Sequence, residues 1–61
     1  MNKYFVALNL TTKMYVTLEE FETSDIHGAY HFDTEEMASS YLRQHEVGLY
    51  TIIPLYVCNL V

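Results

Sequence analysis

The chain has 61 residues, of which 51% are hydrophobic and 15% aromatic, and its eight acidic and three basic side chains give a formal net charge of −5 at pH 7. So apolar a chain does not belong to the disordered class, and its charge disfavours direct binding to nucleic acid or to anionic membranes. We expect one small domain over residues 1–61, with a core so limited that a partner would add to its stability.

The cysteine content and the two ends of the chain predict a cytoplasmic protein. Cys58 is the single cysteine, so no disulfide can form within the chain, and a lone thiol is typical of a reducing compartment. Residues 1–10 alternate and contain one lysine, which does not fit a secretory leader. The apolar segment 49–61 contains Pro54 and Asn59 and is shorter than the ~20 residues of a membrane-spanning helix.

Two strands are predicted in the first third of the chain. Residues 3–10 and 14–21 alternate and are rich in aromatic and β-branched side chains, as half-buried strands are. The Thr-Thr-Lys between them lacks glycine and asparagine, so we expect a β-hairpin with a loop longer than two residues. Residues 20–32 then form a loop that leads into a short third strand around Tyr30 and Phe32.

A helix start follows directly. Asp33 and Glu36 have the spacing of a capping box, and Phe32 and Met37 have that of a hydrophobic staple. Thr34 is an alternative cap one residue later. With either cap, Glu35 and Glu36 lie near the positive end of the helix dipole.

The helix is predicted over residues 34–46, with Gly48 as a left-handed stop. Its apolar side chains recur at the 3.6-residue spacing of an amphipathic helix, so one face should pack on the sheet. The residues predicted on that face are Met37, Ala38, Tyr41, Leu42 and His45.

Residues 49–61 are predicted to form a final strand with two apolar sides. Pro54 cannot donate a ladder hydrogen bond, so the strand should lie at a sheet edge or bend there. The sequence leaves open which side faces the helix. One side carries Ile53, Leu55 and Val57, and the other carries Ile52, Tyr56 and Leu60.

These elements predict an α+β domain with a small, mainly antiparallel sheet of three or four strands in the chain order β-β-(β)-α-β and one helix on one face. Nothing is predicted to cover the other face. Because exposed apolar patches often mark interfaces, we expect the final strand to bind protein, and two-fold self-association is the favoured form. The predicted protein-binding residues are Ile52, Ile53, Leu55, Tyr56, Val57 and Leu60.

The second half of the chain resembles the small acidic proteins of unknown function that phages and prophages of Gram-positive bacteria encode. The resemblance lies in HFDTEEMASSYLRQH followed by YTIIPLYV. It implies a short accessory polypeptide that works by binding a host or viral protein, and we expect its role to be inhibitory or regulatory and its place to be the host cytoplasm. It assigns no role to any residue.

Catalysis, cofactors and metal binding are not expected. His27, His31 and His45 with Cys58 and Asp25 could offer metal ligands, but they lack the paired spacing of a zinc site. A thiol in an apolar strand should be buried and inert. So short a chain also has little room for a water-excluding pocket.

The acidic side chains support an alternative function. Four carboxylates lie within residues 19–25, and two more open the helix. Spaced negative charge of this kind could imitate nucleic-acid phosphates and occupy the basic surface of a DNA- or RNA-binding protein. The residues of this predicted acidic surface are Glu19, Glu20, Glu22, Asp25, Glu35 and Glu36.

Overall fold

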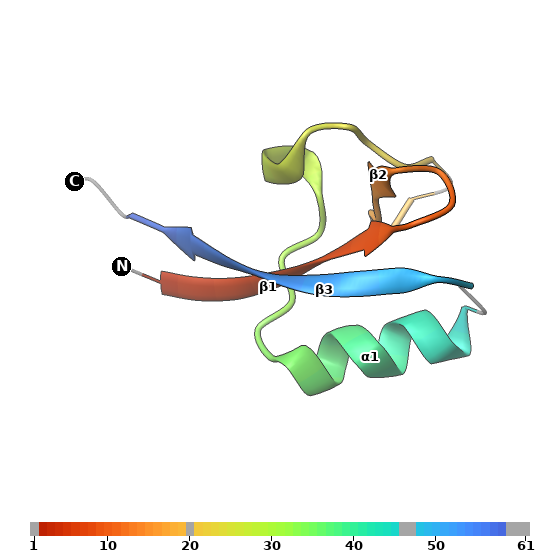
Figure 1. The fold of residues 1–61 in the computed structure, drawn as a ribbon. Helices are drawn as coiled ribbons and strands as arrows, with labels where there is room; N and C mark the ends of the chain where they lie inside the picture. Colours follow the sequence, from red (N-terminus) through yellow and green to blue (C-terminus); the bar gives the residue numbers. More distant parts are fainter. Residues whose placement is uncertain (1, 20, 46–47, 59–61) are drawn as a thin grey trace.

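The computed structural model describes residues 2–19, 21–45 and 48–58. In these residues it contains a three-stranded antiparallel sheet and one α-helix (Figure 1). The strand order is β2-β1-β3, so β1 is central and β3 lies at an edge. The predicted α+β fold is confirmed. The elements are β1 (Asn2–Asn9), β2 (Met14–Tyr15), the 3-10 helix η1 (Ile26–Gly28), α1 (Glu35–Gln44) and β3 (Tyr50–Val57).

β1 and β2 form the predicted hairpin, in which Asn9 lies opposite Met14. Residues 10–13 make the loop between them. The Asn9 side chain holds this loop by accepting a hydrogen bond from the backbone N–H of Thr11 at 2.9 Å. Lys13 adopts a positive φ of 62°, a conformation that glycine more often supplies. The loop is therefore longer than two residues, as predicted.

β2 is shorter than the strand predicted over residues 14–21, because the chain leaves the sheet after Val16. The Val16 N–H still donates to the Ala7 carbonyl at 2.9 Å. Directly afterwards the Thr17 hydroxyl donates to the Phe21 carbonyl at 2.6 Å. Local side-chain hydrogen bonds of this kind stabilise a turn in competition with a strand.

The predicted third strand is reduced to a single bridge at Phe32. Its backbone N–H and C=O both pair with Phe5, each at 2.8 Å. This bridge lies on the edge of β1 that β2 also uses, because Phe5, Ala7 and Asn9 direct their backbone groups to the same side. The chain passes from this bridge to the N-cap of α1 two residues later.

α1 packs on one face of the sheet (Figure 1). The core on this side is centred on Ala7 and Leu42, which are fully buried, together with Val16. Ile52 lies opposite Ala7 in the β1–β3 pair and packs against the same cluster. The strand side that contains Ile52 and Tyr56 is therefore the side that faces the helix layer.

The opposite face of the sheet is also covered, which corrects the prediction of a bare face. Val6, which points away from the Ala7 side, is fully buried. η1 and its flanking chain lie across this side of the sheet (Figure 1). Ala29 is buried, and the His31 ring lies edge-on to Tyr4 with ring centroids 5.6 Å apart. The covering segment was not foreseen because the acidic residues, Ser24 and Gly28 in and before it predicted a solvated loop.

The helix start corrects the favoured cap. Thr34 is the N-cap, and its Oγ1 accepts a hydrogen bond from the Met37 N–H at 3.1 Å. The alternative cap is therefore right, and the capping box and staple placed around Asp33 are wrong. Met37 is 51% exposed, so it does not belong to the packed face.

The rest of the observed helix agrees in part with the predicted helix. Ala38 and Leu42 are buried as predicted, whereas His45 is exposed. Gly48 has no positive φ and so is not the predicted left-handed stop. The predicted last helical residue, Glu46, lies outside the described residues.

Candidate protein-binding surface

β3 has one paired edge and one open edge. The Leu10 N–H donates to the Leu49 carbonyl at 2.9 Å where the β1–β3 pair begins. Because antiparallel pairs alternate along a ladder, every second residue of β3 from Leu49 onward faces β1. The residues between them direct their backbone groups outward, and within the described chain no strand pairs with them. These outward residues are Tyr50, Ile52, Pro54 and Tyr56.

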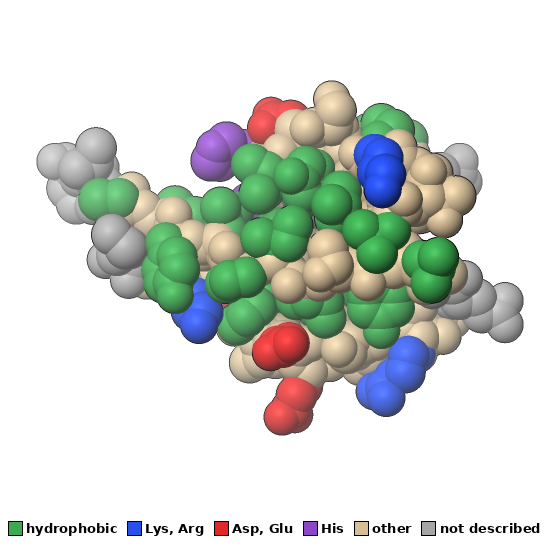
Figure 2. Space-filling model, in the orientation of Figure 1, with side chains coloured by type: hydrophobic (Ala, Val, Ile, Leu, Met, Phe, Trp, Pro, Cys, Tyr) green, Lys and Arg blue, Asp and Glu red, His purple; other side chains and the backbone are tan. Residues whose placement is uncertain are grey.

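The residues of β3 at this open edge are mostly apolar, and none of them is charged. All eight acidic and all three basic residues precede residue 47. Figure 2 shows hydrophobic side chains gathered in a band across the middle of the molecule, with acidic side chains above and below it. We call the described part of this region the β3 surface. It consists of Ile52, Ile53, Leu55, Tyr56 and Val57.

On the helix side, the β3 surface runs beyond the cover of α1. Ile52 is half-buried against the core, but Tyr56, farther along the strand, is 59% exposed. Lys3 lies opposite Tyr56, and its Nζ is 5.6 Å from the Tyr56 ring centroid and 5.3 Å from that of Phe5. This cation–π arrangement fixes the tyrosine ring on an exposed part of the sheet.

On the other side, the side chains of the β3 surface are half-buried. Ile53 lies opposite the buried Val6, and Leu55 lies opposite Tyr4. Val57 is also half-buried, at the end of the strand. Five of the six predicted binding residues therefore lie along one strand at an open edge. The sixth, Leu60, lies outside the described residues.

The predicted acidic surface is divided between the two sides of the sheet. Asp25 belongs to the η1 side, where its carboxylate accepts a hydrogen bond from the His27 N–H at 2.9 Å and caps η1. Glu35 and Glu36 are exposed in the first turn of α1, on the opposite side (Figure 1). Glu19 is exposed and Glu22 half-buried in the segment before η1. Glu20 lies outside the described residues.

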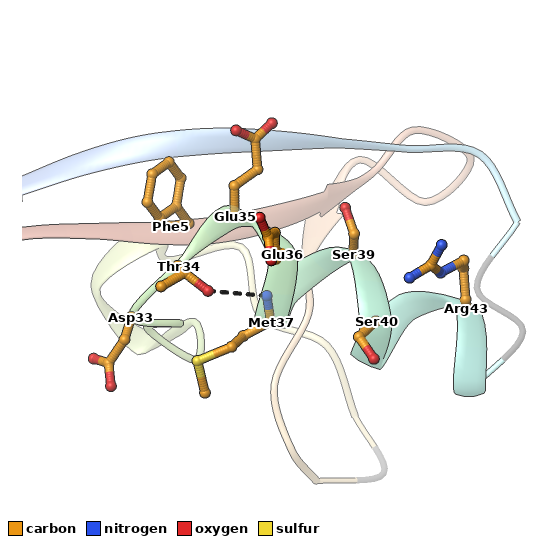
Figure 3. Close-up of a pocket in the computed structure, with 9 residues that line it drawn as sticks. All are labelled: Phe5, Asp33, Thr34, Glu35, Glu36, Met37, Ser39, Ser40 and Arg43. Atoms are coloured by element: carbon orange, nitrogen blue, oxygen red, sulfur yellow. Dashed lines mark hydrogen bonds between the residues drawn. The ribbon is translucent and has the colours of Figure 1, made fainter.

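An open groove of about 930 Å³ runs along α1 from its N-cap to Arg43. Phe5 and Met37 supply apolar surface, and acidic side chains with Arg43 supply polar surface (Figure 3). The Thr34 hydroxyl in this groove is already engaged as the helix cap. The glutamates occupy positions that the helix dipole stabilises, so helix formation accounts for the polar residues here. The residues lining the groove are Phe5, Asp33, Thr34, Glu35, Glu36, Met37, Ser39, Ser40 and Arg43.

The candidate metal and thiol residues do not come together. Cys58 is exposed beyond the end of β3, so the prediction of a buried thiol is wrong. Asp25 and His27 meet through a backbone N–H and not through the imidazole. Across the described residues, no group of three or more His, Cys, Asp or Glu side chains is placed to hold a metal ion.

Sequence reasoning missed one internal polar group. The Nε2 atom of His31 is buried, and no hydrogen-bond partner for it is found in the described part of the chain. The ring lies against Tyr4, and His31 lines a second depression of about 420 Å³ between residues 17–19 and 28–31. Only the covered second face of the sheet reveals this burial, because the sequence alone suggests a solvent-facing histidine.

Comparisons with protein-family models, with curated proteins and with solved structures find no match for this chain. The described residues include no helix long and apolar enough to cross a membrane.

Proposed function

We propose that this chain is a non-enzymatic protein-binding protein that associates with a second copy of itself through the β3 surface. The observation that carries the proposal is the apolar, uncharged strand at an open sheet edge. Each side of this strand retains accessible apolar area, although the helix and the η1 segment cover parts of both. An apolar surface of this kind gains free energy when a partner removes it from water.

The distribution of charge favours a second copy as the partner. In a two-fold contact each surface meets itself, so any concentration of one charge would repel its counterpart. Because this chain has a net charge of −5, most of its surface would repel the same surface of a second copy. Residues 47–61 carry no charged side chain, so the β3 surface avoids it. The resemblance to phage proteins would add a host protein as a further partner of the assembled form.

The alternative, an acidic mimic of nucleic acid, has less support. Such a mimic needs spaced carboxylates on one continuous surface. Asp25 lies on the η1 side of the sheet, whereas Glu35 and Glu36 lie on the α1 side (Figure 1). A single flat basic partner could not contact both groups.

Substitution of Tyr56 tests the proposed self-association. Tyr56→Glu places a carboxylate on the β3 surface, and Lys3 opposite it can pair with the new charge, so the fold should tolerate the change. Burial of this exposed ion pair from each copy in a two-fold contact would cost desolvation free energy that burial of the tyrosine does not. We expect the wild-type chain to sediment as a dimer at low micromolar concentration and Tyr56→Glu to sediment as a folded monomer.

Phe21→Glu is the matched control, because Phe21 is 63% exposed and lies outside the β3 surface. It should leave the dimer intact. A monomeric wild-type chain, or equal loss of association in both variants, would contradict the proposal.

A further inference from the structure

The direction of the Pro54 backbone nitrogen follows from two independent sets of hydrogen bonds. Phe5, which lies opposite Pro54, uses both its N–H and its C=O for Phe32, so it directs no backbone group toward β3. At the start of the same pair, Leu10 donates to Leu49 at 2.9 Å, and the alternation from Leu49 leads to an outward orientation at residue 54. The Pro54 nitrogen therefore faces the open edge.

In this orientation Pro54 does not disturb the β1–β3 ladder, but it hinders pairing of a further strand with β3. β1 requires no donor from residue 54, so the β1–β3 ladder loses nothing. A strand added on the open edge would require that donor, and the exposed pyrrolidine ring would occupy the position of its hydrogen-bonded carbonyl. Pro54 is also central among the outward residues, with Tyr50 and Ile52 before it and Tyr56 after it.

We infer that Pro54 closes the open edge of β3 to strand addition, so that this edge accepts contacts through its side chains and not through a continued backbone ladder. The remainder of the strand is apolar, β-branched or aromatic, and uncharged, which is the composition that makes exposed edges pair with other chains. Proline is one of the few residues that interrupts such pairing without adding charge. The inference does not depend on the proposed dimer, because it concerns the mode of contact and not its occurrence.

Replacement of Pro54 tests the inference. Pro54→Val restores one outward donor and removes the ring, and its β1–β3 ladder is unchanged, so the variant should fold. A two-fold strand pair gains one restored hydrogen bond from each chain, so we expect self-association to strengthen roughly tenfold or more. Larger assemblies that bind thioflavin T should form with rising concentration. Thr51→Val is the matched control, since it introduces the same valine side chain at a position whose N–H already faces β1.

Hydrogen exchange supplies a second readout that needs no variant. In the wild-type chain, the outward amides of Ile52 and Tyr56 should exchange much faster than the inward amides of Ile53 and Leu55 at every concentration. In Pro54→Val the outward amides should become protected as the concentration rises. Concentration-dependent protection of Ile52 and Tyr56 in the wild type to the level of Ile53 and Leu55 would overturn the inference, as would a Pro54→Val variant that associates no more than Thr51→Val. A monomeric wild type would contradict the proposed function alone.

Discussion

At the scale of single residues, the buried Nε2 atom of the His31 imidazole lowers the stability of the folded chain. Its Nε2 is buried without a described partner, and a buried polar atom left unpaired costs about 1–3 kcal/mol. We predict that His31→Phe raises the free energy of unfolding by about 1 kcal/mol, because the ring remains against Tyr4 while the unpaired nitrogen is removed. Urea unfolding measures this change. His27→Phe, at an exposed position, should leave stability nearly unchanged, and a loss of stability in His31→Phe would mean that the nitrogen has a partner.

Predictions for single residues succeeded where the residue's own chemistry decides its position, and failed where contacts with other segments of the chain decide its burial. Pro54 was correctly restricted to an edge or a bend, because a missing N–H limits proline in any sheet, and the strand order selects the edge. The burial of Cys58 was wrong, because an apolar sequence does not reveal where pairing in the strand ends. The burial of His31 depends on a chain segment that crosses the sheet, and no local pattern specifies that crossing.

At the scale of elements, the start of α1 demonstrates how a distant contact decides between two adequate local signals. Asp33 and Thr34 are both good cap residues. The bridge between Phe32 and Phe5 keeps the chain extended through residue 32, and the first helical turn closes on Thr34. The sequence therefore located the helix start to within one residue but could not select the cap. β2 was overestimated for a similar reason, since the turn at Thr17 interrupts a continuing alternation.

The two candidate caps can be separated by experiment. We predict that Thr34→Ala lowers the free energy of unfolding by about 1 kcal/mol, because the Met37 N–H loses its acceptor at 3.1 Å. Asp33→Ala should cost only a few tenths of a kcal/mol, since Asp33 can act there mainly on the helix dipole. Chemical denaturation of both variants gives the comparison. A larger loss in Asp33→Ala would return the cap to the residue that the sequence favoured.

At the scale of the whole molecule, α1 covers one face of the sheet and the η1 segment covers the other (Figure 1). The uncharged edge strand β3 lies between these two layers. The sequence anticipated the helix layer because amphipathic spacing is a local property. It did not anticipate the η1 layer, in which Ala29 is buried and His31 lies against Tyr4, because these contacts join segments far apart in the chain. The β3 surface was predicted to bind protein because a strand that is apolar on both sides is unusual for a sheet covered by a single helix, and that binding stays a prediction.

The separation between charged layers and an uncharged edge predicts an unusual response to salt. Two copies that each carry a net charge of −5 repel one another, and ions screen that repulsion over a distance of about 10 Å at 0.1 M salt. β3 itself contributes no charged side chain to the contact, because residues 47–61 are uncharged, and the one charge beside it, Lys3, has the same sign in both copies and so forms no attractive pair with its counterpart. We therefore predict that raising NaCl from about 50 to about 500 mM strengthens self-association several-fold, as measured by sedimentation equilibrium. An acidic mimic bound to a basic partner would respond in the opposite direction, so weaker association in salt would favour contacts made by the carboxylates.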